Sequence, residues 1–315
     1  MILTLTPNPS VDRTVSLGAP LVPGTVHRIT AASSQSGGKG VNISRAAVAA
    51  GVPTVAVLPA PPDDAYVLEL QHEGIDCRPE PTAGDIRVNL TVTDPAGTTT
   101  KLNSAGPPMT AELLDRMRRS LVGLATAADW VVLAGSLPPG CPDGWYADLV
   151  VAVRPTGARV AVDTSDAPLT ALVERLDGTA APHLMKPNGH ELASLSGADA
   201  DTLETDPAKA AAAAQDLLDR GVREVLVTLG GNGAVLVTAT GAWHATPPPT
   251  TVASTVGAGD CSLFGYLLAD HRGIGDPGAR LALAVAYGSA AAGLPGTTIP
   301  TPSQTHPELV RVHAL

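Results

Sequence analysis

Aromatic residues are scarce in this sequence: Phe, Tyr and Trp together make up 3% of the 315 residues, with a single Phe among them. The core must therefore be built mainly from Ala, Val, Leu and Ile. Charged residues are also few, at 16%, whereas hydrophobic residues reach 44%. That balance excludes a disordered chain. The length suits one large α/β domain with an appendage, or two modest domains.

Cysteine is rare as well, and Cys77, Cys141 and Cys261 lie far apart with no CxxC pair. This pattern argues against a disulfide framework or a structural zinc site, and it favours a reducing compartment. The first residues lack the basic and apolar regions of a signal peptide. No apolar run reaches the ~20 residues that a membrane helix requires. We therefore expect a soluble cytoplasmic protein with no membrane partner.

Basic clusters are missing too. Lys and Arg number 20 against 30 Asp and Glu, which gives a net charge of −10. A nucleic-acid-binding face needs clustered Lys and Arg, so no nucleic-acid partner is expected. Any anion site must be built locally, from a few residues.

Short apolar segments alternate with segments of helical spacing along most of the chain. Strands are predicted at residues 2–6, 55–58, 130–134, 160–163, 184–186 and 222–229, and helices at 40–50, 206–220, 258–271 and 277–292. This alternation predicts a parallel sheet covered by helices on both faces. It defines the fold class as α/β.

Two segments, 11–32 and 87–104, alternate polar and apolar residues with a period of two instead. Strands of this kind bury one face only. We expect a small separate sheet, inserted in two pieces, that covers a cleft or pairs with another subunit. The whole chain, residues 1–315, is interpreted as a single domain carrying this insertion.

The strongest chemical signal is STVGAGDC, residues 254–261, which leads directly into a predicted helix. Gly257, Ala258 and Gly259 can turn tightly and leave backbone N–H groups exposed at the helix N-terminus, where an anion is favoured. Asp260 stands beside that anion site. A carboxylate there makes chemical sense if it takes a proton from a hydroxyl that attacks a phosphoryl group. The alternative is a simple helix cap.

A second glycine-rich segment, SGGKGVN at residues 36–42, also opens a helix, but its spacing is not that of a Walker A loop. Lys39 can neutralise a phosphate, and Asn42 offers a donor and an acceptor to sugar hydroxyls. The chain has only four lysines against sixteen arginines, which makes a Lys between glycines more suggestive. A glycine-rich loop with a solvated Lys is the alternative.

Three further segments follow predicted strands, and each has a functional and a plain interpretation. In KPNGHE, Asn188 and Glu191 share one helix face, which suits Mg²⁺ held through waters or a capping interaction. TLGGNG, residues 228–233, is typical of a ligand crevice in a parallel sheet, or of a hairpin turn. Asp12 in TPNPSVD either accepts hydrogen bonds from sugar hydroxyls or caps a turn.

Taken together and in this order, TPNPSVD, GGKGVN, AGSLPPG, KPNGHE, VTLGGNGA and STVGAGD resemble the motifs of the PfkB (ribokinase-like) carbohydrate kinase family. The resemblance extends from Met1 to about Pro300. Together, TPNPSVD, GGKGVN, Arg87-Val-Asn89 and the KPN segment are similar to its phosphosugar branch. The resemblance implies a Rossmann-like α/β core and a β-sheet lid that makes a homodimer contact. It also implies transfer of the ATP γ-phosphoryl group to a hydroxyl of a sugar phosphate.

The resemblance also implies a role for each matching residue. Asp260 is the general base, and Gly257, Ala258 and Gly259 form the anion hole. Substrate binding falls to Asp12, Gly38, Lys39, Asn42, Arg87, Asn89, Ser136 and Arg28, with Lys39, Arg87 and Arg28 as the cations for the existing phosphate. The ATP side is assigned to Lys186, Asn188, Glu191, Thr228, Gly230, Gly233, Val256, Ala284 and Gly288, and Mg²⁺ to Glu191, Asn188 and Asp163 through water.

Several functions stay open from the sequence. The favoured substrate is fructose 1-phosphate, with tagatose 6-phosphate and fructose 6-phosphate as alternatives. PAPPDD at residues 59–64 replaces a glycine-rich turn of the family, and Cys261 stands where Ser or Thr is usual. A kinase of an unphosphorylated sugar or nucleoside would not require Lys39 and Arg87. A silent sugar sensor would not need Asp260 and its loop, and a dehydrogenase would carry GxGxxG after the first strand.

Overall fold

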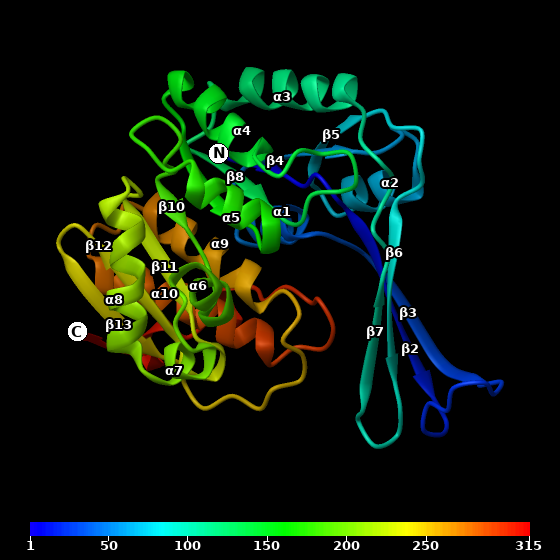
Figure 1. Ribbon diagram of the computed structural model, residues 1–315. Coiled ribbons are helices and arrows are strands. Elements are labelled where there is room, and N and C mark those ends of the chain that lie inside the picture. The colour runs from blue at the N-terminus through cyan, green and yellow to red at the C-terminus, as the bar shows by residue number, and fades with distance from the viewer.

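A ten-stranded sheet runs through the main body of the computed structural model, which describes residues 1–315 (Figure 1). The strand order is β14-β13-β12-β11-β10-β9-β8-β1-β4-β5. The bounds are β1 (Ile2–Leu5), β4 (Thr54–Pro59), β5 (Asp76–Glu80), β8 (Trp130–Ala134), β9 (Arg159–Asp163), β10 (Leu184–Met185), β11 (Glu224–Thr228), β12 (Ala234–Thr238), β13 (Gly241–Thr246) and β14 (Arg311–Ala314).

The predicted parallel sheet is confirmed from β5 to β11, but the last three strands run antiparallel. The glycine segment after β11 is a short helical turn, Gly230–Asn232, and β12 follows directly. A parallel crossover needs a dozen or more residues, so a connection this short can only reverse the chain. The hairpin interpretation of TLGGNG was therefore correct for the backbone.

Helices cover both faces of the sheet. One hydrophobic cluster of 38 buried residues packs α3, α4, α5, α6, α7 and α8 on one face, and a second of 27 packs α1, α9 and α10 on the other. The bounds are α1 (Lys39–Ala49), α2 (Ala65–His72), α3 (Ala111–Ala125), α4 (Trp145–Val153), α5 (Asp166–Glu174), α6 (Gly189–Ser196), α7 (Ala200–Thr205), α8 (Pro207–Asp219), α9 (Ala258–His271) and α10 (Pro277–Ala292). Helix α2 covers β4 and β5 through a smaller cluster.

Local signals explain why several helices begin where they do. Asp206 accepts hydrogen bonds from the N–H groups of Ala208 and Lys209 at the start of α8, as its position before Pro207 predicts. Helices α9 and α10 have the predicted bounds. None of the ten α-helices combines the length and the apolar character that crossing a membrane requires.

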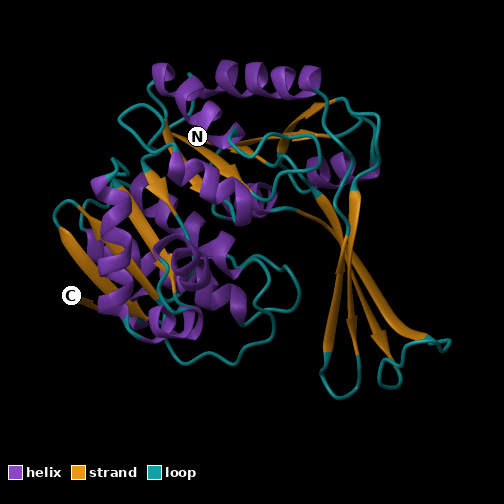
Figure 2. Cartoon of the chain, in the orientation of Figure 1, coloured by secondary structure: helices purple, strands orange, loops and turns teal.

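The two period-2 segments form a separate four-stranded sheet, β3-β2-β6-β7, which projects from the main body (Figure 2). Its strands are β2 (Ser10–Leu17), β3 (Ile29–Gly37), β6 (Arg87–Thr93) and β7 (Thr99–Asn103). Strands β2 and β6 pair in parallel, with Ser10 opposite Arg87 and Asp12 opposite Asn89. The predicted small sheet is confirmed, and we call these four strands the lid.

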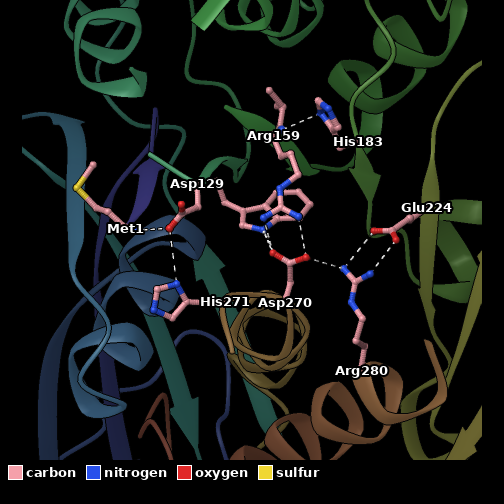
Figure 3. Close-up of polar contacts among 10 residues, drawn as sticks. Met1, Asp129, Arg159, His183, Glu224, Asp270, His271 and Arg280 are labelled. Atoms are coloured by element: carbon pink, nitrogen blue, oxygen red, sulfur yellow. Dashed lines mark hydrogen bonds and ion pairs between the residues drawn. The ribbon is translucent and has the colours of Figure 1, made fainter. Parts of the chain in front are cut away.

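Charged side chains tie helices to strands at the edge of the main sheet where the parallel strands begin (Figure 3). Asp270 of α9 accepts hydrogen bonds from the Trp130 indole at 2.9 Å and from Arg159 at 2.7 Å, and it pairs with Arg280 of α10 at 3.5 Å. Arg280 also pairs with Glu224 at 2.9 Å. This cluster therefore lies at the edge of the sheet opposite to the edge where the parallel strands end.

Candidate active site

A cavity of about 950 Å³ opens where the parallel strands end. Residues just after β1, β8 and β10 line it from below, and the first residues of β2 and β6 line it from the root of the lid. The starts of α1 and α9 complete the wall. Ligand crevices of parallel α/β sheets lie at this edge because the connecting loops diverge there.

Most of the residues that the sequence assigned to a site line this one cavity. They are Asp12, Gly38, Lys39, Asn42, Arg87, Asn89, Ser136, Lys186, Asn188, Thr228, Gly230, Gly233, Val256, Gly257, Ala258, Gly259, Asp260 and Gly288.

Four predicted residues do not line the cavity: Arg28, Ala284, Glu191 and Asp163. Arg28 is exposed and precedes β3 at the far end of the lid, because Ile29 pairs with Leu17 whereas Gly37 pairs with Ser10 at the root. Within one chain it does not reach the cavity. Ala284 is fully buried in the core, and its neighbour Val285 lines the cavity instead. Successive residues of an α-helix are rotated by about 100° around its axis. Ala284 therefore faces the core, and Val285 faces the cavity.

The residues predicted for Mg²⁺ do not form a metal cage. Asn188 and Glu191 form a capping box at the start of α6: Asn188 Oδ1 accepts from the Glu191 N–H at 2.8 Å, and Glu191 Oε2 accepts from the Asn188 N–H at 2.8 Å. Glu191 and Asp163 do not line the cavity. The Asp163 carboxylate is bound by two ammonium groups, so the structure corrects its assignment to the metal.

The start of α9 presents free backbone donors. Gly257 precedes the helix with a φ of 78°, a left-handed conformation that glycine adopts without strain. The N–H groups of Gly259 and Asp260 find no acceptor within the protein, because the helix begins at Ala258. They line a cavity wall at the positive end of the helix dipole. Free N–H groups at a helix start are the kind of donors that can bind an anion.

Asp260 does not cap its own helix. Its Oδ2 accepts a hydrogen bond from Asn42 Nδ2 at 2.7 Å, and only 6% of the residue is exposed. Burial raises the pKa of Asp260 to about 6, against the attraction of Lys39 and with added repulsion from Asp163. The plain interpretation of Asp260 as a helix cap was therefore wrong. Asn42, assigned to the sugar, contacts this carboxylate.

Lys39 and Lys186 bring two positive charges to the same wall. Lys39 Nζ lies 2.6 Å from Asp163 Oδ1, and Lys186 Nζ lies 3.1 Å from Asp163 Oδ2. Burial acts to lower the pKa of Lys39, but attraction to Asp163 and Asp260 outweighs it and holds that pKa above its usual range. Burial likewise opposes ionisation of Asp163, yet Lys186 and Lys39 hold its pKa below the usual value. Lys39 and Asp163 are thus charged at neutral pH.

The lid end of the cavity is rich in polar atoms. Asp12 Oδ1 accepts hydrogen bonds from Asn89 Nδ2 at 3.0 Å and from Ser10 Oγ at 2.9 Å. Arg87 Nη1 donates to the Ser104 carbonyl at 3.0 Å. The buried atoms Thr6 Oγ1, Asn8 Oδ1, Arg87 Nε and Asn89 Oδ1 have no partner. Buried polar atoms are rarely left unpaired, so this end suits a ligand with several hydroxyl or phosphate oxygens.

Asn8 is a cavity residue that sequence reasoning missed. It lies within the TPNPSVD motif, but only Asp12 of that motif was assigned a role. Its Nδ2 donates to the Ala105 carbonyl at 3.0 Å, which fixes the amide and leaves Oδ1 at the cavity wall. The presence of Asn8 in this motif was the sequence signal that could have identified it.

The opposite end of the cavity is largely aliphatic. The residues there that the sequence did not assign are Pro247, Pro248, Pro249, Thr250, Val252, Thr255, Val285, Ser289 and Ala292. In the sequence, the proline run is typical of a stiff spacer, and the α10 residues carry no local signal of a ligand. No Phe, Tyr or Trp side chain lines the cavity. This end offers a flat apolar ligand group van der Waals contact without ring stacking.

The chain belongs to the pfkB family of carbohydrate kinases, whose family model matches residues 6–304. A 1-phosphofructokinase of Rhodobacter capsulatus is 36% identical over 312 residues, covering 96% of this chain and 94% of that one. Phosphofructokinase-2 from Escherichia coli in complex with substrates and products is 29% identical, with a TM-score of 0.86 over 96% of both chains. A ribokinase of Arabidopsis thaliana, complexed with ribose and ATP, is 20% identical with a TM-score of 0.73 and shares the fold over 96% of each chain.

These comparisons confirm the predicted family, the ribokinase-like fold and a carbohydrate kinase. The dehydrogenase hypothesis is set aside with them.

We expect Asp260→Asn to stabilise the protein at pH 8. The pKa of Asp260 is raised from 3.8 to about 6 in the folded state, so folding binds a proton between those pH values and the ionised carboxylate disfavours folding above them. The substitution removes that penalty and keeps an acceptor for Asn42. The free energy of unfolding should rise by about 1–3 kcal/mol at pH 8, measured by urea denaturation.

The gain should shrink as the pH falls from 7 to 4, because wild-type Asp260 then becomes neutral as well. A gain that is equal at pH 8 and pH 4, or a loss at pH 8, would show that burial does not raise this pKa.

Proposed function

We propose that this protein transfers the γ-phosphoryl group of ATP to a hydroxyl of a ketohexose phosphate. Fructose 1-phosphate is the preferred substrate, and fructose 1,6-bisphosphate is the product. One observation carries the proposal: a buried carboxylate stands beside unpaired N–H groups at a helix start, with two lysine ammonium groups in the same wall. The 1-phosphofructokinase of Rhodobacter capsulatus supports the choice of fructose 1-phosphate.

Asp260 is proposed as the general base. A sugar hydroxyl has a pKa far above 7, so Asp260 does not remove its proton beforehand but accepts it as the new bond forms. The hydroxyl oxygen bonds to the γ-phosphorus, the bond from that phosphorus to the bridging oxygen of ADP breaks, and the proton moves to the Asp260 carboxylate. The Asn42 hydrogen bond at 2.7 Å fixes one carboxylate oxygen and leaves the other for the substrate.

The anion hole stabilises the transferred group. In the transition state the negative charge spreads over its oxygens, which the N–H groups of Gly259 and Asp260 can meet without rearrangement. Lys186 is buried beside the same loop and adds a fixed positive charge. Because these donors are held by the backbone and by burial, little free energy is lost to their ordering when the substrates bind.

Arg87 and Lys39 are proposed to bind the phosphate that the substrate already carries, since a neutral sugar would require neither. Asp12, whose carboxylate is oriented by Asn89 and Ser10, accepts hydrogen bonds from the sugar hydroxyls. Fructose 6-phosphate is the second candidate, because phosphofructokinase-2 from Escherichia coli superposes on nearly the whole chain. Tagatose 6-phosphate presents the same chemical groups.

Mg²⁺ is proposed to enter with ATP. No group of three or more carboxylate, imidazole or thiol side chains forms a metal cage. Mg²⁺ commonly keeps its waters and binds through substrate phosphates with few protein ligands, and that mode fits this cavity. Asn188, which lines the cavity, would then hold it through water, with Glu191 behind it in the capping box, and the ion would neutralise phosphate charge. The aliphatic end of the cavity receives the adenine.

The lid is proposed to form a homodimer contact. The lid strands and the 18–28 loop that joins β2 to β3 carry exposed apolar side chains, namely Leu21, Val22, Val26, Ile29, Val88 and Leu102. Apolar side chains that gather at an exposed surface are typical of an interaction site. Light scattering should give twice the chain mass in solution. Val26→Asp combined with Ile29→Asp should return the protein to the monomer, and a monomeric wild type would contradict the contact.

The activity is tested by an ADP-release assay with fructose 1-phosphate, fructose 6-phosphate, tagatose 6-phosphate, fructose and ribose. We expect the highest kcat/KM with fructose 1-phosphate and little turnover of the unphosphorylated sugars. Asp260→Asn should lower kcat by about 10²–10⁴ with little change in the KM of the sugar.

Near-normal turnover by Asp260→Asn would exclude Asp260 as the base. An absence of turnover with every sugar, under conditions in which the protein binds ATP, would instead favour the silent sensor.

We expect Arg87→Ala to raise the KM for fructose 1-phosphate by about tenfold or more, and the KM for fructose much less. Only fructose 1-phosphate carries a phosphate group that would lose its contact with Arg87. Steady-state kinetics on both sugars measure the split. Arg78→Ala is the matched control, since Arg78 is an exposed arginine of β5 that pairs with Asp76. Equal effects of Arg87→Ala on the two sugars would mean that Arg87 does not bind phosphate.

A further inference from the structure

Two of the four lysines of this chain converge on a single carboxylate. Asp163 ends β9, between β8 and β10 in the sheet, and is completely buried. Lys39, the first residue of α1, reaches its Oδ1 at 2.6 Å, and Lys186, the residue after β10, reaches its Oδ2 at 3.1 Å. One buried anion thus connects a helix start and two strand ends.

Lys39 and Lys186 lie between the cavity and Asp163. Both lysines line the cavity, whereas Asp163 lies behind them and does not. The side chain of Lys39 is 34% exposed and that of Lys186 is 4% exposed. An ammonium group has three N–H donors. Asp163 Oδ1 accepts one hydrogen bond from Lys39, and Asp163 Oδ2 forms an ion pair with Lys186. Both lysines therefore retain donors for a ligand in the cavity.

The two ammonium groups have different neighbours in the cavity wall. Lys186 Nζ is beside the proposed anion hole: a Cβ atom on Gly259 would lie 3.4 Å from it. Lys39 is the first residue of α1, and Gly38 and Asn42 of the same segment also line the cavity. Asp163 is the one group in contact with both lysines.

We propose that Asp163 is a positioning residue that fixes Lys39 for the phosphate of the sugar and Lys186 for the phosphoryl group in transfer. The inference rests on the proposed function. Without this anion, the two like charges would repel each other, and each would sit on a flexible four-carbon chain. With it, the separation of the two phosphate-binding cations is set before either substrate binds.

The competing explanation is that Asp163 only braces the fold, and the chain contains a matched control for it. Asp270 is another largely buried carboxylate, 14% exposed, that binds two cationic side chains, Arg159 and Arg280. It lies at the opposite edge of the sheet (Figure 3). Asp163→Asn and Asp270→Asn should both lower the melting temperature, but only the first should change the kinetics.

Steady-state kinetics with fructose 1-phosphate and ATP separate the two explanations. Asp163→Asn should raise the KM of both substrates by about tenfold or more and lower kcat. Asp270→Asn should leave both KM values within about twofold of wild type. A variant Asp163→Asn that folds and keeps either KM at the wild-type value would overturn the proposal.

The pH dependence of kcat/KM distinguishes the two explanations, because a purely structural role of Asp163 would not change it. Asp260 is faced by Lys39, Lys186, Asp163 and Asn42, and the negative charge of Asp163 raises its pKa while the two lysines and the Asn42 hydrogen bond lower it. Removing that negative charge should shift the acid limb of kcat/KM to lower pH in Asp163→Asn and leave it in place in Asp270→Asn. An unmoved or upward-shifted limb in Asp163→Asn counts against the proposal.

Asp163→Glu covers the case in which the Asn variant does not fold. It keeps the charge but displaces the carboxylate by one methylene, so both KM values should rise; wild-type values for both would reject positioning. Calorimetric titration with ATP, which needs no turnover, should show weaker binding by both Asp163 variants. If wild type binds ATP but phosphorylates none of the sugars, the proposed function fails, while the titration still decides whether Asp163 positions Lys186.

Discussion

The proposed chemistry depends on keeping a carboxylate charged while it is buried beside free backbone donors. Burial favours the protonated form of Asp260, which could not accept a proton. Asn42 and Lys39 offset that effect, and Asp163 acts against them. A pKa of about 6 leaves Asp260 ionised at neutral pH, as the proposed general base requires. The positions of the surrounding charges are therefore constraints on the chemistry.

The parallel sheet supplies the means to assemble those charges. Residues 39, 163, 186 and 260 lie far apart in sequence, but each stands at the end of a strand or the start of a helix, and these ends share one edge of the sheet. The other edge is closed by Asp270, Arg159 and Arg280. Charged residues at one edge of the sheet thus line or support the cavity, and those at the other edge hold helices and strands together.

Sequence patterns predicted the parts of this structure that are locally encoded. The bounds of α9 and α10 follow from Gly257 before the one and an Asp276–Pro277 start for the other, and the period-2 segments identified the lid. The glycine loops and Asp260 were found for the same reason, because tight turns and helix starts leave residue-specific signals.

What could not be predicted rests on contacts between distant segments. The Asn42–Asp260 hydrogen bond and the Lys39–Asp163 pair join residues that no local pattern connects. The exchange of Ala284 for Val285 depends on the rotation of α10 in the core, and the distance of Arg28 from the cavity depends on the length of the lid. The antiparallel β12 and β13 were missed because a short glycine turn fits both interpretations.

The low aromatic content has a practical consequence. Trp130 and Trp145 are buried in the main body, and neither they nor Trp243 lines the cavity. The intrinsic fluorescence of the protein therefore reports whether the sheet is folded and is insensitive to occupancy of the pocket. Optical detection of ligand association requires an introduced fluorophore or a chromophoric nucleotide.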